Sequence, residues 1–364
     1  MRNIITSMIG LLVFTGLAGA IEKDLGKPHP IEAKHWDSPF RPGTSTIVGS
    51  YTTVIRLGPE KFVAFNNTMA PGPEDGLLMW EGKSPTKFKL VGVVLEHQKI
   101  NDLLDKKGAA HPKRRFTRPF MDWHPEKGFV GIIHVCRGYP PPDARVYPAL
   151  ISSPTGKPGD WTYHGRLKGE IWDEFGDKGK ARWGNGGGFF YQPDAPEKPD
   201  GKNPLNNQYV FFSDQYAGPG SLAILYSSDG KRWQFYRRDG DPGAPIVNLI
   251  KVVAGKPMIF PCVTRMGQQG WTLFLSEKWP PIAIWRLWSP DGLSWKLFGD
   301  QPEIVKPKDL MIKNVTAWYD PLKATLHGYL SVWSKQPDGT HNYDKYHATT
   351  RQLVPDSRKS QSAP

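Results

Sequence analysis

The stretch "ILYSSDGKRWQFY", residues 224–236, decides how this sequence is interpreted. An apolar run enters a Ser-Ser-Asp-Gly turn and leaves through Trp233, and Asp-Gly between alternating apolar residues is a strong hairpin signal. A second stretch, "RLWSPDGLSWKLF" at residues 286–298, follows the same Ser-x-Asp-Gly-x-x-Trp pattern. The two copies raise the question of whether the whole chain repeats one structural unit.

Two weaker copies extend the pattern towards the N-terminus. Residues 149–165, "ALISSPTGKPGDWTYHG", have a longer turn before Trp161, and residues 77–92, "LLMWEGKSPTKFKLVG", have Phe88 at the Trp position. The aromatic anchors Phe88, Trp161, Trp233 and Trp295 are spaced by 73, 72 and 62 residues, and one more period reaches the strand-like run 345–354. These spacings divide the chain into five units, a pattern typical of propellers and arrays.

Each unit also has a front half that reads strand, turn, strand, as in "TVIRLGPEKFVAF" and "FMDWHPEKGFVGI". Two strands in front and two around the Asp-Gly-type turn predict four strands per unit. The sequence therefore predicts an all-β fold, a five-bladed β-propeller of four-stranded antiparallel blades over residues 46–354. Pairing between the two ends of the propeller should complete the last blade. Residues 21–45 are predicted as an extended arm, and 355–364 as a disordered tail.

The Ser-x-Asp-Gly-x-x-Trp turns at 227–233 and 289–295 resemble the blade turns of five-bladed glycoside hydrolases, including families 43, 32 and 130. They also look like a shortened sialidase Asp-box. Asp229 and Asp291 are interpreted as turn formers, because Asp at such positions hydrogen-bonds its own turn. The resembled families place an Asp at the start of the first blade, an Asp in the second and a Glu at the start of the third. Here the first and third blades begin "IVGSYTT" and "WGNGGGFF", without a carboxylate.

The N-terminus and the charge indicate where the protein works. Residues 1–20, with Arg2 near the start and Ala-Gly-Ala at the end, have the layout of a cleaved secretory signal. The formal net charge of +12 falls to +11 in the remaining 344 residues (364 minus 20). For an exported chain, a basic surface favours an anionic glycan, uronate-rich or sulfated, over nucleic acid, and a solvated surface without a partner is the alternative. No membrane insertion after cleavage and no cofactor are expected, although a structural metal in the channel stays open.

Polar residues at the starts of the inner strands predict a hydrophilic pocket in the channel, because polar groups are costly to bury without partners. These strand starts carry the pairs Tyr51-Thr52, Thr117-Arg118, Asn185-Gly186 and Lys313-Asn314, with Asn248 as the equivalent in the fourth unit. The far ends of the second strands should add His134, Arg137, Asp214, Arg265 and Trp333. Arg118, Arg137 and Arg265, near one channel mouth, would together bind carboxylate or sulfate oxygens. Cys136 and Cys262 are predicted as separate buried thiols.

Hydrolysis of a glycosidic bond needs two carboxyl groups, one protonated and one ionised. Asp37, in the stiff segment "HWDSPF", is predicted as the base over the channel mouth, and Glu170, before Ile171 and Trp172, as the acid. Asp122 is expected to tune one of them and Arg118 to hold the substrate. Two alternatives stay open: a non-catalytic glycan-binding propeller, and a lyase that uses Tyr51 or His134 as the base.

Overall fold

The structure is a computed structural model, and it describes most of the chain from residue 25 to residue 356. The described ranges are 25–47, 50–67, 76–101, 104, 115–137, 145–169, 186–198, 200–215, 218–236, 247–248, 258–277, 281–335, 337–339 and 341–356. The predicted signal at residues 1–20 and most of the predicted tail lie outside these ranges. No helix within them is long and apolar enough to cross a membrane.

The described secondary structure is β, apart from three short 3-10 turns. Antiparallel meanders follow one another along the chain, each containing an inner hairpin joined to an outer one. The first two are β1 (Ser50–Gly58), β2 (Lys61–Asn67), β3 (Gly76–Gly82), β4 (Phe88–Glu96), and β5 (Arg115–His124), β6 (Gly128–Arg137), β7 (Arg145–Ser153), β8 (Thr162–Arg166). Next come β10 (Gly187–Tyr191), β11 (Tyr209–Gln215), β12 (Gly218–Ser227), β13 (Arg232–Phe235), and β15 (Met258–Arg265), β16 (Trp271–Glu277), β17 (Ala283–Ser289), β18 (Lys296–Leu297). The last are β20 (Met311–Asp320), β21 (Thr325–Lys335) and β22 (His341–Thr350).

Hydrogen bonding groups these strands into four sheets. β1–β4 and β5–β8 form sheets of four strands, and β20–β22 form a sheet of three. The meanders β10–β13 and β15–β18 belong to one 11-stranded sheet, because Gly187 pairs with Cys262 in a parallel bridge between β10 and β15. The short strands β9 (Lys168–Gly169), β14 (Val247–Asn248) and β19 (Ile304–Val305) attach to that sheet. The fold is therefore all-β and antiparallel within each meander.

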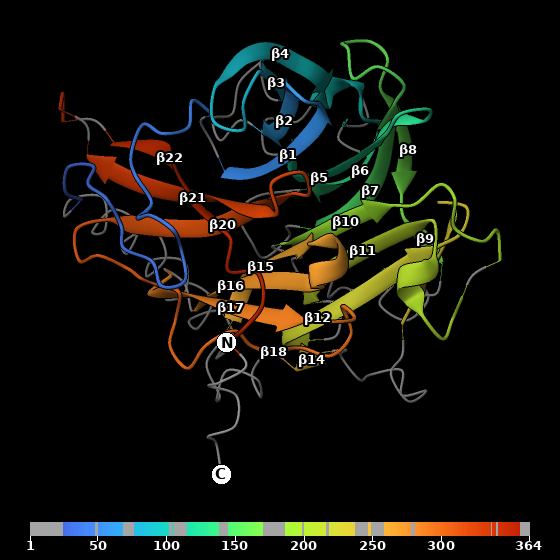
Figure 1. Cartoon of the computed structure of the whole chain (residues 1–364). Helices are drawn as coiled ribbons and strands as arrows, with labels where there is room; N and C mark the ends of the chain where they lie inside the picture. Colours follow the sequence, from blue (N-terminus) through green and yellow to red (C-terminus); the bar gives the residue numbers. More distant parts are fainter. Residues whose placement is uncertain are drawn as a thin grey trace, which may run out of the picture.

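The first strands of successive meanders meet at the centre of the molecule (Figure 1). β1 contacts β5, β5 contacts β10, β10 contacts β15, β15 contacts β20, and β20 contacts β1 again. Polar side chains join several of these neighbours. Thr53 Oγ1 donates to Pro119 O at 2.9 Å, Thr264 Oγ1 donates to Ala317 O at 3.1 Å, and Arg56 forms an ion pair with Asp320 at 2.8 Å. The centre of the molecule is therefore built from strands of every meander.

The core lies between neighbouring meanders, and the predicted aromatic anchors are part of it. Trp233 is fully buried in a cluster with Ile132, from the preceding meander, and Leu225, from its own. The Trp161 ring lies 5.7 Å from the ring of Phe65 in the first meander. These contacts confirm that the aromatic residue after the turn packs between meanders, where large rings bury the most apolar surface.

The Asp-Gly turns have the geometry expected of turn-forming aspartates. Asp229 Oδ1 accepts hydrogen bonds at 2.8 and 2.9 Å from the main-chain N–H groups two and three residues further on. Trp233 Nε1 donates to Gly230 O at 3.0 Å. In the second copy, Asp291 accepts the equivalent bonds at 2.9 and 2.7 Å, and Trp295 closes the turn in the same way. The two copies are one structural motif.

The segment 25–47 runs along the outside of the last meander. Its residues Ile31 and Phe40 pair with each other and are buried. Arg41 forms an antiparallel bridge with His347 in β22, the edge strand of its sheet. Thr46 Oγ1 then donates to Phe88 O in β4, at 2.7 Å. The arm therefore pairs with the end of the chain and connects the last meander to the first.

The fourth meander differs from its predicted alignment. Asn248 was expected at the start of an inner strand, but it lies in β14 and pairs with Ser221 of β12. The inner hairpin is instead β15 and β16, which are joined through a turn at Gly267–Gln269. The Pro-containing turn that aligned the other units is absent here, so the sequence pattern pointed to the wrong segment.

Candidate functional site

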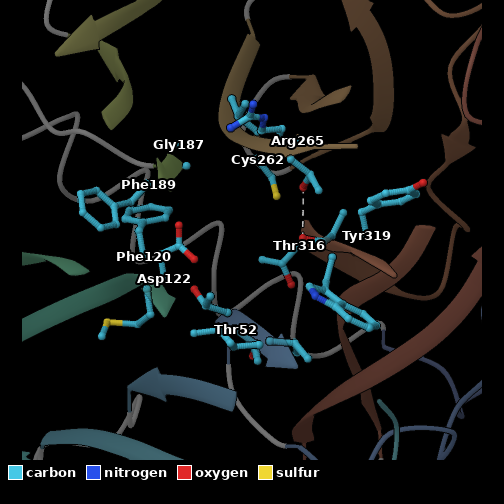
Figure 2. A pocket seen from close by; sticks show the side chains of 18 of the residues that line it. Thr52, Phe120, Asp122, Gly187, Phe189, Cys262, Arg265, Thr316 and Tyr319 are labelled. Atoms are coloured by element: carbon cyan, nitrogen blue, oxygen red, sulfur yellow. Dashed lines mark hydrogen bonds between the residues drawn. The ribbon is translucent and has the colours of Figure 1, made fainter. Parts of the chain in front are cut away.

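A cavity of about 400 Å³ lies among the central strands. Its walls come from the first strand of every meander, so residues far apart in the sequence face one space. The lining consists of residues 51–56 of β1, 119–123 of β5, 187–190 of β10, 261–265 of β15, and 314–319 of β20 together with Pro321 after it. Figure 2 shows several of these side chains, among them Asp122 from β5, Arg265 from β15 and Thr316 from β20. This central cavity is the candidate site.

Asp122 is the carboxylate among the described lining residues. Its Oδ1 accepts a hydrogen bond from Trp123 N and its Oδ2 accepts one from Tyr191 N, both at 2.8 Å. Burial raises the pKa of Asp122 to about 6, while these two bonds and the positive charges of Arg265 and His124 lower it. Loss of hydration disfavours the charged form, and here it outweighs the stabilising contacts. Asp122 can therefore exchange a proton near neutral pH.

The end of the cavity near Asp122 is strongly charged. Arg265, at the C-terminal end of β15, lies over the Trp271 ring at 5.5 Å and donates to Gln192 Oε1 at 2.9 Å. The Arg56–Asp320 ion pair lies at the corresponding ends of β1 and β20, and its carboxylate is almost fully buried. Planar guanidinium groups at this end suit hydrogen bonding to carboxylate or sugar oxygens.

β-bulges lie at the starts of the central strands, beside the end of the cavity that Tyr51 lines. Tyr51, Arg118 and Phe260 have φ angles of 52°, 54° and 53°, and the pairing register of β1, β5 and β15 shifts at these residues. Positive φ in residues other than glycine costs about 1 to 3 kcal/mol each and clusters at functional sites. The repeated bulge turns these side chains towards one another. Arg118 Cζ lies 5.0 Å from the Tyr51 ring, and the Phe260 ring lies 6.1 Å away.

The buried cavity-wall atoms Thr52 Oγ1, Asn314 Oδ1 and Thr316 Oγ1 have no hydrogen-bond partner among the residues that the structure describes. Thr52 and Asn314 are 5% and 2% exposed. A buried polar group without a partner costs free energy, and in native proteins such groups are usually satisfied by water or by a ligand. The cavity wall therefore offers hydrogen-bonding atoms to a polar ligand.

Cys262 also lines the cavity, and it is a free cysteine. Burial raises the pKa of its thiol to about 11, so the sulfur stays protonated and weakly nucleophilic at neutral pH. Cys262 is a free thiol as predicted, but it is half-buried and not fully buried, whereas the side chain of Cys136 lies outside the described part. Among the described residues, no group of three His, Cys, Asp or Glu side chains is placed to hold a metal ion.

The structure brings Asp122, Arg265 and Asn314 together around the cavity, as the sequence predicted. Arg118 joins them through its contact with Tyr51. However, the expected convergence of arginines at one mouth is wrong. Arg118 lies near the start of β5, whereas Arg265 ends β15, at the end of the cavity occupied by Asp122.

Two further predicted residues lie away from the cavity. Asp37 is exposed beside β22, where its main-chain N–H donates to Thr349 O at 2.8 Å and its Oδ1 accepts from Arg351 N at 3.4 Å. Pairing of the arm with β22 therefore holds Asp37 at the outside and not over the channel mouth. His134 is fully buried, and its ring lies 5.6 Å from Phe120, inside the sheet packing.

The remaining predicted site residues either lie away from the cavity or have side chains outside the described part of the chain. Trp333, in β21, is half-buried and does not line the cavity. Glu170 and Asn185 lie outside the described residues. For Thr117, Arg137 and Asp214 the backbone belongs to β5, β6 and β11, but the side chains are not described. The predicted roles of these five residues stay predictions.

Sequence reasoning missed Phe260 and Thr316, whereas it named Lys313 together with Asn314 at the start of an inner strand. Lys313 Nζ lies 5.4 Å from the Tyr51 ring, and it directly precedes Asn314, which was predicted. Phe260 was missed because the fourth unit was aligned one segment too early. Thr316 follows Asn314 at the two-residue spacing that points side chains to the same face of a strand, so alternation was a usable signal.

No protein-family model matches the sequence, and no curated protein matches it. Solved structures do resemble it. A thermostable family-43 glycoside hydrolase has a TM-score of 0.51 and 13% identity, over 84% of this chain and 90% of that one. An N-acetylgalactosamine deacetylase from F. plautii, in complex with blood group B trisaccharide, has a TM-score of 0.54 and 10% identity, over 92% and 98%. An exo-β-1,3-galactanase from Clostridium thermocellum has a TM-score of 0.53 and 14% identity, over 87% and 61%.

These similarities show the fold: the chain is a β-propeller similar in structure to these proteins. At 10 to 14% identity they do not carry any activity over to this chain.

Proposed function

We propose that the chain forms a five-bladed propeller that binds and hydrolyses a glycan with acidic groups in its central channel. The cyclic contacts of β1, β5, β10, β15 and β20 support five blades. In the last blade, β20–β22 supply three strands and the arm, which pairs at Arg41 with His347, supplies the outer edge. The excess of Lys and Arg, 47 against 35 Asp and Glu, supports an anionic partner.

The observation that carries the proposal is Asp122, a carboxyl group inside the cavity with a pKa raised to about 6. A general acid must be protonated at the working pH and still release its proton readily, and a raised carboxyl pKa meets both needs. In the proposed reaction Asp122 protonates the leaving glycosidic oxygen. Arg265, at the same end of the cavity, holds substrate oxygens.

Hydrolysis also needs a second carboxyl group to activate water or to attack the sugar. We propose that it comes from the acidic segment with Glu170, Asp173 and Glu174, which lies outside the described residues. The described ends of this segment are Gly169, at the outer edge of its sheet, and Gly186, beside the cavity. Replacing each carboxylate in turn by its amide should identify the one on which turnover depends.

The test is a screen with uronate, sulfated and neutral oligosaccharides, in which new reducing ends, unsaturated uronate and binding are measured separately. Asp122→Asn should bind the substrate and lower turnover by roughly 100-fold or more, the usual contribution of a general acid. Asp229→Asn, in a turn outside the cavity, is the control and should keep full turnover. Full turnover by Asp122→Asn would contradict the proposed role.

A second candidate is a non-catalytic glycan-binding propeller. It is favoured by the fact that Asp122 is the single carboxylate among the described lining residues. Binding without reducing ends in every arm of the screen would establish it. The lyase alternative has less support, because His134 is buried in the core and the Tyr51 hydroxyl is also buried.

We also propose export to the periplasm or the medium, on the pattern of residues 1–20. Sequencing of the N-terminus of the purified mature protein tests this, because cleavage after Ala20 would leave Ile21 first. An uncleaved Met1 in the exported fraction would contradict it. For an exported chain, nucleic acid is not a proposed partner.

A further inference from the structure

Two positive side chains meet at one aromatic ring where the central strands begin. Arg118 Cζ lies 5.0 Å and Lys313 Nζ lies 5.4 Å from the Tyr51 ring centroid, and we call these three residues the cationic mouth. Tyr51 lines the cavity, and both cationic side chains are half-buried. Cation–π contact with an aromatic face holds each positive group in place, and it is strongest where water is excluded.

The backbone fixes this arrangement. Tyr51 and Arg118 both have positive φ, and the pairing register of β20 shifts at Lys313. Three bulges in three different strands therefore bring Arg118 and Lys313 to the same aromatic ring, that of Tyr51. Strained bulges persist only where the surrounding structure enforces them. The backbone positions of Arg118 and Lys313 are therefore fixed by the packing of the central strands.

Neutral polar groups lie next to both ends of this cluster. Thr52 follows Tyr51 and Asn314 follows Lys313, and each has a buried oxygen in the cavity wall without a partner in the described part of the chain. A carboxylate or sulfate ester between Arg118 and Lys313 would receive charged donors from both, and Thr52 and Asn314 would meet the adjacent sugar hydroxyls. Guanidinium forks bind planar oxyanions with two parallel hydrogen bonds.

We propose that the cationic mouth binds one carboxylate or sulfate ester group of a glycan that occupies the channel. This inference rests on the proposed function of the same channel. Arg118 and Asp122 are four residues apart on β5, about 13 Å at the rise of an extended strand. The acidic group at the mouth therefore belongs to a different sugar from the one at Asp122, and the channel recognises an oligosaccharide and not a single acidic monosaccharide.

The test compares Kd values for oligogalacturonate, for a sulfated oligosaccharide of similar length and for an uncharged oligosaccharide. Lys313→Met keeps the side-chain stem on Tyr51 and removes the charge. The matched control is Lys296→Met. Lys296, on β18, lies 4.9 Å from the centre of the Trp288 ring on β17, outside the cavity. Its replacement changes the net charge by the same amount. Arg118→Met is the second mouth variant, and thermal unfolding checks that all variants are folded.

The expected result is about tenfold weaker binding of an acidic oligosaccharide by Lys313→Met and by Arg118→Met, with the uncharged oligosaccharide unaffected. Lys296→Met should bind like the unmodified protein. The probe that loses affinity, uronate or sulfated, identifies the group. Equal weakening by Lys313→Met and Lys296→Met would overturn the inference, because it would show general attraction to a basic surface.

Failure of the inference and failure of the proposed function give different results. If the unmodified protein binds acidic and uncharged oligosaccharides equally and Asp122→Asn still abolishes turnover, the channel function stands and the cationic mouth is wrong. If no oligosaccharide binds at all, both are wrong.

Discussion

Asp122 combines a structural contact with a proposed chemical role at one position. Its carboxylate accepts N–H groups from Trp123 in its own strand and from Tyr191 at the end of β10, so it connects two central strands. The same carboxylate faces the cavity. A group held by two main-chain bonds keeps a fixed orientation, which a catalytic acid needs. The pH dependence of the free energy of unfolding tests the structural setting of Asp122 separately from the turnover that tests its proposed chemical role.

The first prediction concerns this pH dependence. The pKa of Asp122 rises from 3.8 to about 6 on folding, so the folded state holds the proton more tightly than the unfolded state. The stabilisation that protonated Asp122 adds to the free energy of unfolding is fully present below about pH 4. It falls as the pH rises and is lost above about pH 6, a change of roughly 3 kcal/mol. Urea unfolding across this window should therefore show a steeper loss for the natural protein than for Asp122→Asn. Parallel pH profiles would contradict the raised pKa.

At the scale of the element, the Asp-Gly turns connect sequence and fold most directly. Their hydrogen bonds lie within seven residues of sequence, so the motif alone predicted them, together with the buried Trp that follows. The inner-strand bulges are different. The positive φ of Tyr51 and Phe260 is imposed by neighbouring strands, and nothing in the local sequence signals it. The position of Asp122 in the cavity wall was predictable in part, because the sequence placed strand β5 correctly.

The second prediction tests the turn role of Asp229. Burial raises the pKa of its carboxyl, but hydrogen bonds from Arg232, Lys231 and Ser227 outweigh burial and hold the pKa below its usual value. Asp229→Ala should cost about 1 to 2 kcal/mol in the free energy of unfolding, because two N–H groups lose their acceptor. Glycan turnover should stay unchanged. A loss of turnover in a fully folded Asp229→Ala protein would show that the turn interpretation is wrong.

The third prediction concerns the arm. Gly328 in β21 lies under Trp36 and Phe40, and an added Cβ would come within 2.8 Å of the Trp36 ring and 3.0 Å of Phe40. Gly328→Ala should therefore displace the arm and cost about 1 to 3 kcal/mol, as overpacking does. Gly58→Ala, where the nearest atom is 3.8 Å away, is the control. Proteolysis within residues 25–47 should become faster only in Gly328→Ala, and unchanged cleavage there would contradict the packing of the arm.

At the scale of the whole molecule, contacts between segments far apart in the sequence explain which site predictions failed. The sequence indicated repeated units and therefore strand starts that face one channel, which placed Asp122 and Asn314 correctly. It predicted pairing between the two ends of the propeller but not that the arm is the segment that pairs with β22, and this pairing holds Asp37 at the outside. Contacts between the two ends of a chain leave no local pattern, because they depend on how all the units close together. Asp37 and His134 were therefore assigned to a channel that they do not reach.

The central claim is that the channel between the central strands is the glycan site, with Asp122 at one end and the cationic mouth at the other. The most direct measurement is a crystal structure of Asp122→Asn with a bound oligogalacturonate. We expect sugar density inside the cavity, with one ring against residue 122 and one carboxylate between Arg118 and Lys313. An oligosaccharide bound on the outer surface, or an empty channel at a saturating concentration, would contradict it.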